Sequence, residues 1–390
     1  MVCPYELITG GSQINAIDLA ARMRARGHEV RIFGPDGPLT ARIHASQIPF
    51  TASGRRPDEV SAGSVMAMAG AIRRFRPHVV HTYEAPAAVN AALAAACHPY
   101  RAIATVLSMS VPPYLPADMP LTVGTHQIAR SVVRAGAVHV IEPPIDTTYD
   151  APGDVSAARE SIGVDAEEFV VAVVGRLSDE LDKARGVIAA IEALDGMALS
   201  RPVTLIVAGT GDMADAVRTC AEASINPHLT VRLEGDVSDP RAIYDAADVV
   251  FGMGGSALRA LAHAKPLVVQ GVEGFWVPFT PQTAPLFYEQ GFYGEQESPT
   301  DFSDVVRPLM ESAALRAELG AFGRRVVTSR YDLDVAADEL ERLYLDHVAP
   351  GLPTRVGQAA RAGARYAKFR AARSAPGLRR AYRSILGRRG

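Results

Sequence analysis

The sequence predicts an α/β fold with two doubly wound, Rossmann-like domains that face each other across a cleft. Three observations lead to this prediction. The chain has 390 residues, which is too long for one comfortable domain and suits two of ordinary size. Short apolar segments alternate with segments of helical periodicity, as expected of parallel strands covered by helices on both faces. A proline-rich stretch near residues 143–152 divides this alternation into two blocks.

The first block forms the expected N-terminal domain, residues 1–145. It opens with a short strand, and Gly27 and His28 close the helix that follows. Apolar runs such as those around residues 79–81 and 103–107 favour buried strands. We expect helices at 14–26, 65–75 and 85–97 and further strands at 29–33, 78–81 and 102–107.

The second block forms the expected C-terminal domain, residues 150–330. Its apolar runs are again short and are separated by segments of helical periodicity. We expect strands at 169–174, 203–208, 230–234, 249–252 and 267–270, and helices at 185–194, 213–223, 240–246 and 256–263.

The composition is that of a core-forming globular protein, with 48% hydrophobic and 21% charged residues. Cys3, Cys97 and Cys220 are far apart and lack metal-ligand spacing, which argues against a disulfide framework or a structural zinc site and indicates a reducing compartment. The sequence shows neither a secretory signal nor an apolar run of the roughly 18 residues that span a bilayer. We therefore expect a soluble, cytoplasmic protein.

Two glycine-rich segments lie where a strand leads into a helix. Gly10 and Gly11 follow the opening strand, and Gly254, Gly255 and Ser256 follow the strand at 249–252. Glycine lets the backbone approach a ligand, and a helix N-terminus offers unpaired N–H groups to an anion. Ser256 is the expected helix cap. The second segment lacks the Gly-Lys-Ser/Thr ending of a P-loop, so an NTPase is disfavoured. For the two glycines of the first segment taken alone, an ordinary strand-to-helix turn is the preferred interpretation.

A basic loop follows the strand at 169–174. It carries Arg176, Lys183 and Arg185 at the edge of the expected sheet where ligands of parallel sheets bind. Arginine and lysine there can neutralise a diphosphate. The alternative, which we weigh equally, is a solvated loop whose charge is balanced by three acids, Asp179, Glu180 and Asp182.

Taken in order, these segments resemble the retaining GT-B glycosyltransferases of family 4. The resemblance covers roughly residues 1–348. It is specific because several loose motifs occur in the family's order, among them the Arg-Gly-His-Glu-Val that ends the first helix and the Gly-Arg-Leu that precedes the basic loop. The matching segments are residues 10–30, 72–85, 138–153, 173–194, 204–217, 231–251 and 258–271.

The resemblance implies a site and a reaction. Arg176 and Lys183 would hold the leaving diphosphate of a nucleotide diphosphate sugar, with Arg185 as a substitute because Lys183 is two residues farther from the arginine than usual. The glycine-rich segments would line the cleft, and a closing helix at about 332–348 would cross back to the first domain. The family uses neither a metal nor another cofactor, and the sequence lacks the Asp-x-Asp signature of metal-dependent transferases.

Two departures from the family pattern concern the site. Arg259 stands where the second of two glutamates is expected and is itself an expected donor-binding residue. The ribose contact of the missing glutamate then needs another source, for which Glu273 is the candidate. Ser108 stands where the family has a cleft histidine, which leaves His81 and His126 as cleft candidates. A buried core histidine is an equally good interpretation of His81, and a solvent-exposed loop acid is an equally good one of Glu273.

The predicted function is transfer of a sugar to an acceptor hydroxyl, with retention and without metal. The alternatives are a sugar-nucleotide epimerase or hydrolase on the same fold, and a binding protein that has lost catalysis. Residues 351–390 contain eleven Lys or Arg and no Asp or Glu. This basic tail suits peripheral contact with an anionic membrane at the inner face, and a solvated or disordered tail is the alternative. Nucleic acid is not an expected partner, since the body is acidic and carries no recognition motif.

Overall fold

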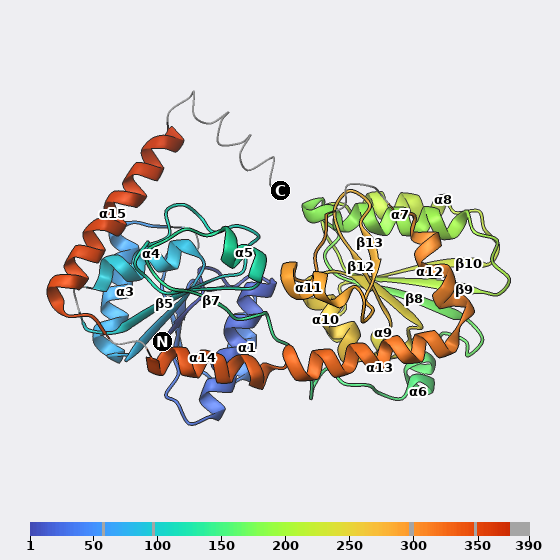
Figure 1. Ribbon diagram of the computed structural model, residues 1–390, viewed down its shortest axis with the longest axis horizontal. Coiled ribbons are helices and arrows are strands. Elements are labelled where there is room, and N and C mark those ends of the chain that lie inside the picture. The colour runs from blue at the N-terminus through green and yellow to red at the C-terminus, as the bar shows by residue number, and fades with distance from the viewer. Residues whose placement is uncertain (57–58, 96–97, 296–299, 347–348, 375–390) are drawn as a thin grey trace. The chain divides into compact units, whose positions relative to one another are not determined.

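A computed structural model describes residues 1–56, 59–95, 98–295, 300–346 and 349–374. The chain divides into two compact units (Figure 1). Unit 1 contains Met1–Pro144 and the chain from Leu333 onward, and unit 2 contains Ile145–Asp332. The division falls inside the proline-rich stretch. Of the residues discussed above, Cys97 and the last sixteen residues of the basic tail lie outside the described ranges.

Unit 1 is built on a seven-stranded, all-parallel sheet with the order β3-β2-β1-β4-β5-β6-β7. The opening strand has only two residues and still pairs with a neighbour on each side. The strands are β1 (Val2–Cys3), β2 (Ile32–Gly34), β3 (Phe50–Ala52), β4 (Val79–Tyr83), β5 (Arg101–Val106), β6 (Leu121–Val123) and β7 (Val138–Val140). The helices before residue 145 are α1 (Gly11–Ala25), α2 (Thr40–Ala45), α3 (Ala62–Phe75), α4 (Ala85–Ala94) and α5 (His126–Ser131).

Unit 2 is built on a six-stranded sheet with the order β10-β9-β8-β11-β12-β13, parallel except for its last strand. The strands are β8 (Phe169–Val174), β9 (Val203–Ala208), β10 (Leu229–Gly235), β11 (Val249–Gly252), β12 (Leu267–Gln270) and β13 (Trp276–Pro278). The helices are α6 (Val155–Ser161), η2 (Glu180–Asp182), α7 (Lys183–Asp195), α8 (Ala214–Ala223), α9 (Arg241–Ala246), α10 (Gly254–Ala262), α11 (Ala284–Gln290), α12 (Phe302–Glu311) and α13 (Ala313–Arg330). Strands β8, β9, β11 and β12 have the predicted bounds.

Strand β8 shows why these wholly apolar runs form central strands. Successive side chains of a strand point to opposite faces. Phe169 and Val171 pack in the core on one face of the sheet, and Val170 and Ala172 pack in the core on the other. Both faces are buried, so no polar residue is tolerated until the strand ends. The chain first turns polar at Gly175 and Arg176, at the carboxyl edge.

Two C-terminal helices belong to unit 1 and pack against its N-terminal part. Helix α14 (Leu333–Asp346) lies beside α1, where Arg26 makes ion pairs with three of its acids, at 2.6–3.2 Å from Asp334, Asp338 and Glu341. Helix α15 (Leu352–Ser374) packs on α4, and both can be followed in Figure 1. Residues 352–374, somewhat more than half of the basic tail, are therefore a packed helix, so the disordered interpretation is wrong for them.

Both polar and apolar contacts hold α15 against the N-terminal part of unit 1. The buried Arg355 guanidinium donates to the carbonyl of Ala95 at 2.7 Å. Ala362 is buried in the core that includes α4. Tyr114 stacks against Phe369, with ring centroids 4.3 Å apart. These contacts distinguish the helix from a solvated tail.

The aromatic segment near the single tryptophan belongs to the core of unit 2. Trp276 is almost fully buried and contacts the ring of Phe302, while Phe279 and Phe287 are fully buried. The aromatic rings of this segment thus serve the packing of unit 2. Along the described residues, no helix combines the length and the hydropathy needed to cross a bilayer.

Candidate functional site

The loops after β8 and β9 run backbone against backbone at the carboxyl edge of unit 2. The Gly175 amide donates to the Ala208 carbonyl at 2.9 Å, which extends the pairing past the strands. A Cβ at Gly209 would lie 1.8 Å from the Gly175 carbonyl oxygen, and one at Gly211 would lie 2.2 Å from that of Leu177. Only glycine fits at these two positions. The edge therefore presents main chain and the few side chains that leave it, Arg176 first.

Arg176 and Lys183 converge on one carboxylate. Arg176 Nη2 and Lys183 Nζ each lie 3.2 Å from the same atom, Oε2 of Glu180. The Arg176 and Glu180 side chains are more than half exposed, and that of Lys183 is 21% exposed. A single anionic oxygen can thus contact both cations at once. The structure brings together the two residues expected to hold a diphosphate, with a side-chain carboxylate on them.

Arg185 is directed to other partners. Its Nε lies 2.7 Å from Asp179 Oδ1 and 3.6 Å from Asp182 Oδ1. Neither of these acids contacts Arg176 or Lys183 in the described ion pairs. Lys183 rather than Arg185 is therefore the partner of Arg176, despite its longer spacing. The proposed substitution of Arg185 for Lys183 finds no support in this geometry.

The start of α7 is held in place from β12. Asp182 adopts a left-handed conformation, with φ of 53°, directly before Lys183. Gln270 at the end of β12 donates from Nε2 to the carbonyls of both residues, at 2.9 and 3.1 Å. A Cβ at Gly186 would lie 1.8 Å from that same Nε2, so any larger residue there would displace the Gln270 amide from this position. The Asp182 carboxylate accepts the backbone N–H of Glu273 at 3.0 Å, while the Glu273 side chain is exposed.

Helix α10 begins two residues before its predicted start. Its N-cap is Met253 and Gly254 is its first residue, so the prediction that Ser256 caps this helix is wrong. Ser256 lies in the first turn, and its hydroxyl donates back to the Met253 carbonyl at 3.2 Å. Gly254 can open the helix because it adopts a φ of 56°. No side chain caps this end of the helix. Its first-turn amides, including that of Gly255, have no partner within the helix.

Arg259 pairs within unit 2. Its Nε lies 3.3 Å from Oδ2 of the buried Asp150. The same carboxylate lies 3.8 Å from His263 Nε2, and His263 Nδ1 lies 2.7 Å from Asp245. Burial lowers the pKa of the His263 imidazole, but the two carboxylates outweigh it and raise the pKa above its usual value. A charged cluster thus fixes α10 to Asp150, which lies within the proline-rich stretch. A contact of Arg259 with the donor stays a prediction.

A buried carboxylate that the sequence analysis did not identify lies at the carboxyl edge of unit 1. Glu84 follows β4 with a φ of 66°, in a region that non-glycine residues rarely adopt. Its oxygens accept from the Leu107 amide at 3.0 Å, the Ser108 hydroxyl at 2.8 Å and the Ser12 hydroxyl at 3.4 Å. Burial raises its pKa. Glu84 ties the glycine-rich segment of Gly10 and Gly11 to the loop after β5.

The two histidine candidates differ in position. His81 is 1% exposed, and its ring nitrogens form hydrogen bonds of 2.6 Å with Tyr344 and Thr105. Burial lowers its pKa to about 3, so the ring is neutral at physiological pH. His81 is a satisfied core histidine and its assignment to the cleft is wrong. His126 is exposed as the first residue of α5, directly after the capping Thr125.

Comparisons with known proteins agree with this arrangement. Residues 9–119 match the model of glycosyltransferase family 4, and residues 168–312 match that of glycosyl transferases group 1. The D-inositol 3-phosphate glycosyltransferase of Mycolicibacterium vanbaalenii is 29% identical over 223 residues, which are 52% of this chain and 48% of that protein. The same-named protein of Mycobacterium bovis is 33% identical over 221 residues, or 52% and 44%. The chain thus spans about half the length of the curated relatives it matches.

Solved structures show the same fold over most of the chain. Anabaena HepE in complex with UDP superposes with a TM-score of 0.71 at 16% identity, covering 89% of this chain and 99% of HepE. A glycosyltransferase from Rickettsia africae gives 0.70 at 14% identity, covering 88% and 97%. At such identities the likeness shows the fold alone. The fold and the two family matches together place this chain among the GT-B glycosyltransferases of family 4 and group 1.

Proposed function

We propose that this protein transfers a sugar from a nucleoside diphosphate donor to an acceptor hydroxyl. The observation that carries the proposal is the convergence of Arg176 and Lys183 on one oxygen of Glu180, at the end of β8. Ligands of open parallel sheets bind at this edge. The match of residues 168–312 to glycosyl transferases group 1 and the UDP bound to the structural neighbour HepE support a diphosphate donor.

In this proposal the diphosphate replaces Glu180 on the two cations. Negative charge grows on the diphosphate as the bond to the sugar breaks, so cations already in place stabilise the transition state more than the bound donor. Lys183 is fixed by the hydrogen bond from Gln270 to its carbonyl, and Arg176 by the paired backbone around it. The uncapped first turn of α10 would add N–H donors from Gly255 onward, since the Gly254 N–H already donates to the Phe292 carbonyl at 2.8 Å.

Retention of configuration and independence of metal are parts of the same proposal. A metal would serve to neutralise the leaving diphosphate, and two cations on one anion can do this instead. The family supports retention of the configuration at the anomeric carbon of the sugar. Retention requires the acceptor hydroxyl to attack the same face of the sugar from which the diphosphate leaves. Glu273, whose backbone is held by Asp182 near the start of α7, is the proposed ribose contact.

The acceptor belongs to unit 1 in this proposal. The relatives carry the name D-inositol 3-phosphate glycosyltransferase, which makes a polyol phosphate the first acceptor class to screen. We further propose that the protein works in the cytoplasm and touches the inner membrane face through its basic tail. Helix α15 packs on α4 and leaves Lys368 and Arg370 exposed, which suits anionic lipid.

A screen of radiolabelled nucleotide sugars, each with and without candidate acceptors and with EDTA, tests the proposed reaction. Labelled product that depends on the acceptor and survives EDTA is the expected result. Label released equally without an acceptor would instead identify a hydrolase, and an isomerised donor would identify an epimerase. Binding of nucleoside diphosphates without turnover of any donor would instead identify a binding protein that has lost catalysis.

A further inference from the structure

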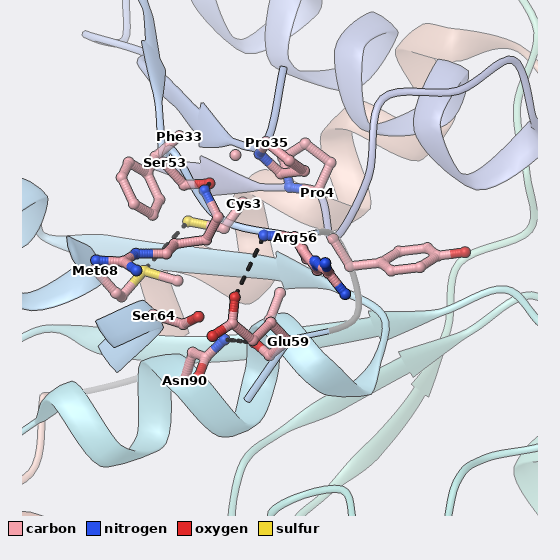
Figure 2. Close-up of a pocket in the computed structure, with 14 residues that line it drawn as sticks. Cys3, Pro4, Phe33, Pro35, Ser53, Arg56, Glu59, Ser64, Met68 and Asn90 are labelled. Atoms are coloured by element: carbon pink, nitrogen blue, oxygen red, sulfur yellow. Dashed lines mark hydrogen bonds between the residues drawn. The ribbon is translucent and has the colours of Figure 1, made fainter. Parts of the chain in front are cut away.

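Unit 1 contains a small pocket at the carboxyl ends of β1 and β2, beside α3 and α4 (Figure 2). Its cavity volume is about 40 Å³, well below the roughly 300–1,000 Å³ of small-molecule sites. A buried polar atom in it, Asn90 Oδ1, has no hydrogen-bond partner among the described residues, while Asn90 Nδ2 donates to the Glu59 carbonyl at 2.9 Å. A cavity of this size has room for water, which can donate to Oδ1. The pocket therefore calls for no larger ligand.

Tyr293 in unit 2 carries a stronger indication of a ligand contact. It follows α11 in the chain, yet its hydroxyl lies at the start of α10. A Cβ on Gly254, the first residue of α10, would lie 2.4 Å from the Tyr293 hydroxyl oxygen and 2.9 Å from the ring carbon that bears it. The hydroxyl therefore occupies the space that a side chain at position 254 would take, and the glycine admits a phenol to the uncapped end of the helix.

The backbone around Tyr293 is fixed on both sides. The Phe292 carbonyl accepts the Gly254 N–H at 2.8 Å, and the Gly294 carbonyl accepts the Val272 N–H at 2.9 Å. The Tyr293 carbonyl accepts from the side-chain amide of the last residue of α11 at 2.7 Å. The segment is thus tied to α10 and to the loop after β12. It takes up the first N–H of α10 and brings a hydroxyl donor to the same place.

The Tyr293 hydroxyl is free to donate to a ligand. The residue is half-buried, and its hydroxyl makes no hydrogen bond within the part of the chain that the structure describes. Burial raises the pKa of the Tyr293 phenol, and the charge of the Glu180 carboxylate raises it further. The phenol therefore keeps its proton at physiological pH. Since Glu180 is the carboxylate on Arg176 and Lys183, this influence also relates the hydroxyl to the two cations.

We propose that Tyr293 binds the donor by a hydrogen bond from its hydroxyl to the phosphate that carries the sugar. This inference rests on the proposed transferase function and adds a neutral donor to the cation pair of Arg176 and Lys183. Charge on this phosphate grows as the sugar leaves, so the hydrogen bond strengthens in the transition state. The phenol keeps its proton throughout.

Tyr293→Phe removes the hydroxyl and keeps the ring, so calorimetry on the full chain tests the proposal. UDP, GDP and ADP are titrated into the wild type, and the one that binds most tightly is compared with its monophosphate, which lacks the terminal phosphate. Y293F should weaken binding of the diphosphate roughly tenfold or more and change the affinity for the monophosphate less than about twofold. The control Tyr149→Phe, which changes an exposed tyrosine of unit 2, should bind both as the wild type does.

Urea unfolding of Y293F separates a ligand contact from a structural role. The hydroxyl has no partner among the described residues, so its removal should leave the unfolding midpoint unchanged. A lowered midpoint together with an equal loss of affinity for diphosphate and monophosphate would show that the hydroxyl supports the fold, and would overturn the proposal. Full diphosphate affinity in Y293F overturns it as well and leaves the transferase function standing. If the wild type binds none of the three diphosphates, the proposed function fails together with this inference.

Discussion

Replacing Glu180 by glutamine should make the protein bind UDP more tightly. Glu180 Oε2 lies 3.2 Å from both Arg176 and Lys183, so a diphosphate can reach these cations only after the carboxylate leaves. Glutamine keeps the size of the side chain and removes the competing charge. Arg176→Gln should have the opposite effect, because it removes a cation that the diphosphate needs.

The size of the effect follows from the exposure of the ion pairs. Exposed pairs contribute about 0.2–1 kcal/mol each, and the Arg176 and Glu180 side chains are 56% and 60% exposed. Breaking both pairs of Glu180 therefore costs roughly 0.5–1.5 kcal/mol, so E180Q should lower the Kd of UDP about two- to tenfold. A charge-assisted hydrogen bond contributes about 1.5–3 kcal/mol, so R176Q should raise the Kd by roughly ten- to a hundredfold.

Calorimetric titration of UDP into the wild type and each variant at about 0.15 M salt measures both effects. Asp179→Asn is the matched control. It removes the same charge from the residue directly before Glu180, and this residue shares no ion-pair partner with Glu180, since Asp179 pairs with Arg185. Its Kd should stay within about twofold of the wild type, because any change reflects only long-range charge that salt screens. An E180Q variant that binds UDP no better than D179N would refute the reasoning.

Three further predictions concern stability and the tail. Gly209→Ala should lower the free energy of unfolding of unit 2 by about 1–3 kcal/mol or more in a denaturant titration, because its Cβ would clash with the Gly175 carbonyl. Gly175→Ala is the control and should be tolerated, since a Cβ there would have no heavy atom within 4 Å. The pKa of His263 is raised in the folded protein, so protonation of its imidazole stabilises the fold at pH values below its unfolded-state pKa of about 6.5. This contribution is lost as the pH rises through the folded-state pKa. Urea unfolding should therefore show a loss of stability from pH 6 to 8 that His263→Gln abolishes. The variant K368Q/R370Q should reduce flotation with vesicles containing phosphatidylserine, and equal flotation of variant and wild type would end the membrane proposal.

The framework of both sheets was predictable because it depends on local pattern. A run such as Phe169–Val174 is apolar at every position, which only a strand covered on both faces explains. The same pattern places Arg176 and Lys183 at the carboxyl edge, since the first polar residues mark the strand end. Helix starts were less predictable. Helix α10 opens on Gly254 without a side-chain cap, so the search for a capping residue led to Ser256.

Groups that depend on distant partners were not predictable. Glu84 accepts from Ser12 and Ser108, which are 72 and 24 residues away, and only its position after an apolar strand could have drawn attention to it. His81 had two equally good interpretations until Tyr344, 263 residues later, proved to be its partner. From the sequence, Arg355 is one of the cations of the basic tail. In the structure it is buried and donates a hydrogen bond to the carbonyl of a residue 260 positions earlier. Periodicity and composition predict local structure, but they do not indicate which distant loops contact one another in the fold.

A crystal structure of the protein with UDP tests the central claim most directly, because it shows where the diphosphate binds. We expect the diphosphate oxygens within hydrogen-bond distance of Arg176 and Lys183, with the Glu180 carboxylate turned away from both. UDP bound elsewhere, with the two cations still paired to Glu180, would contradict the account.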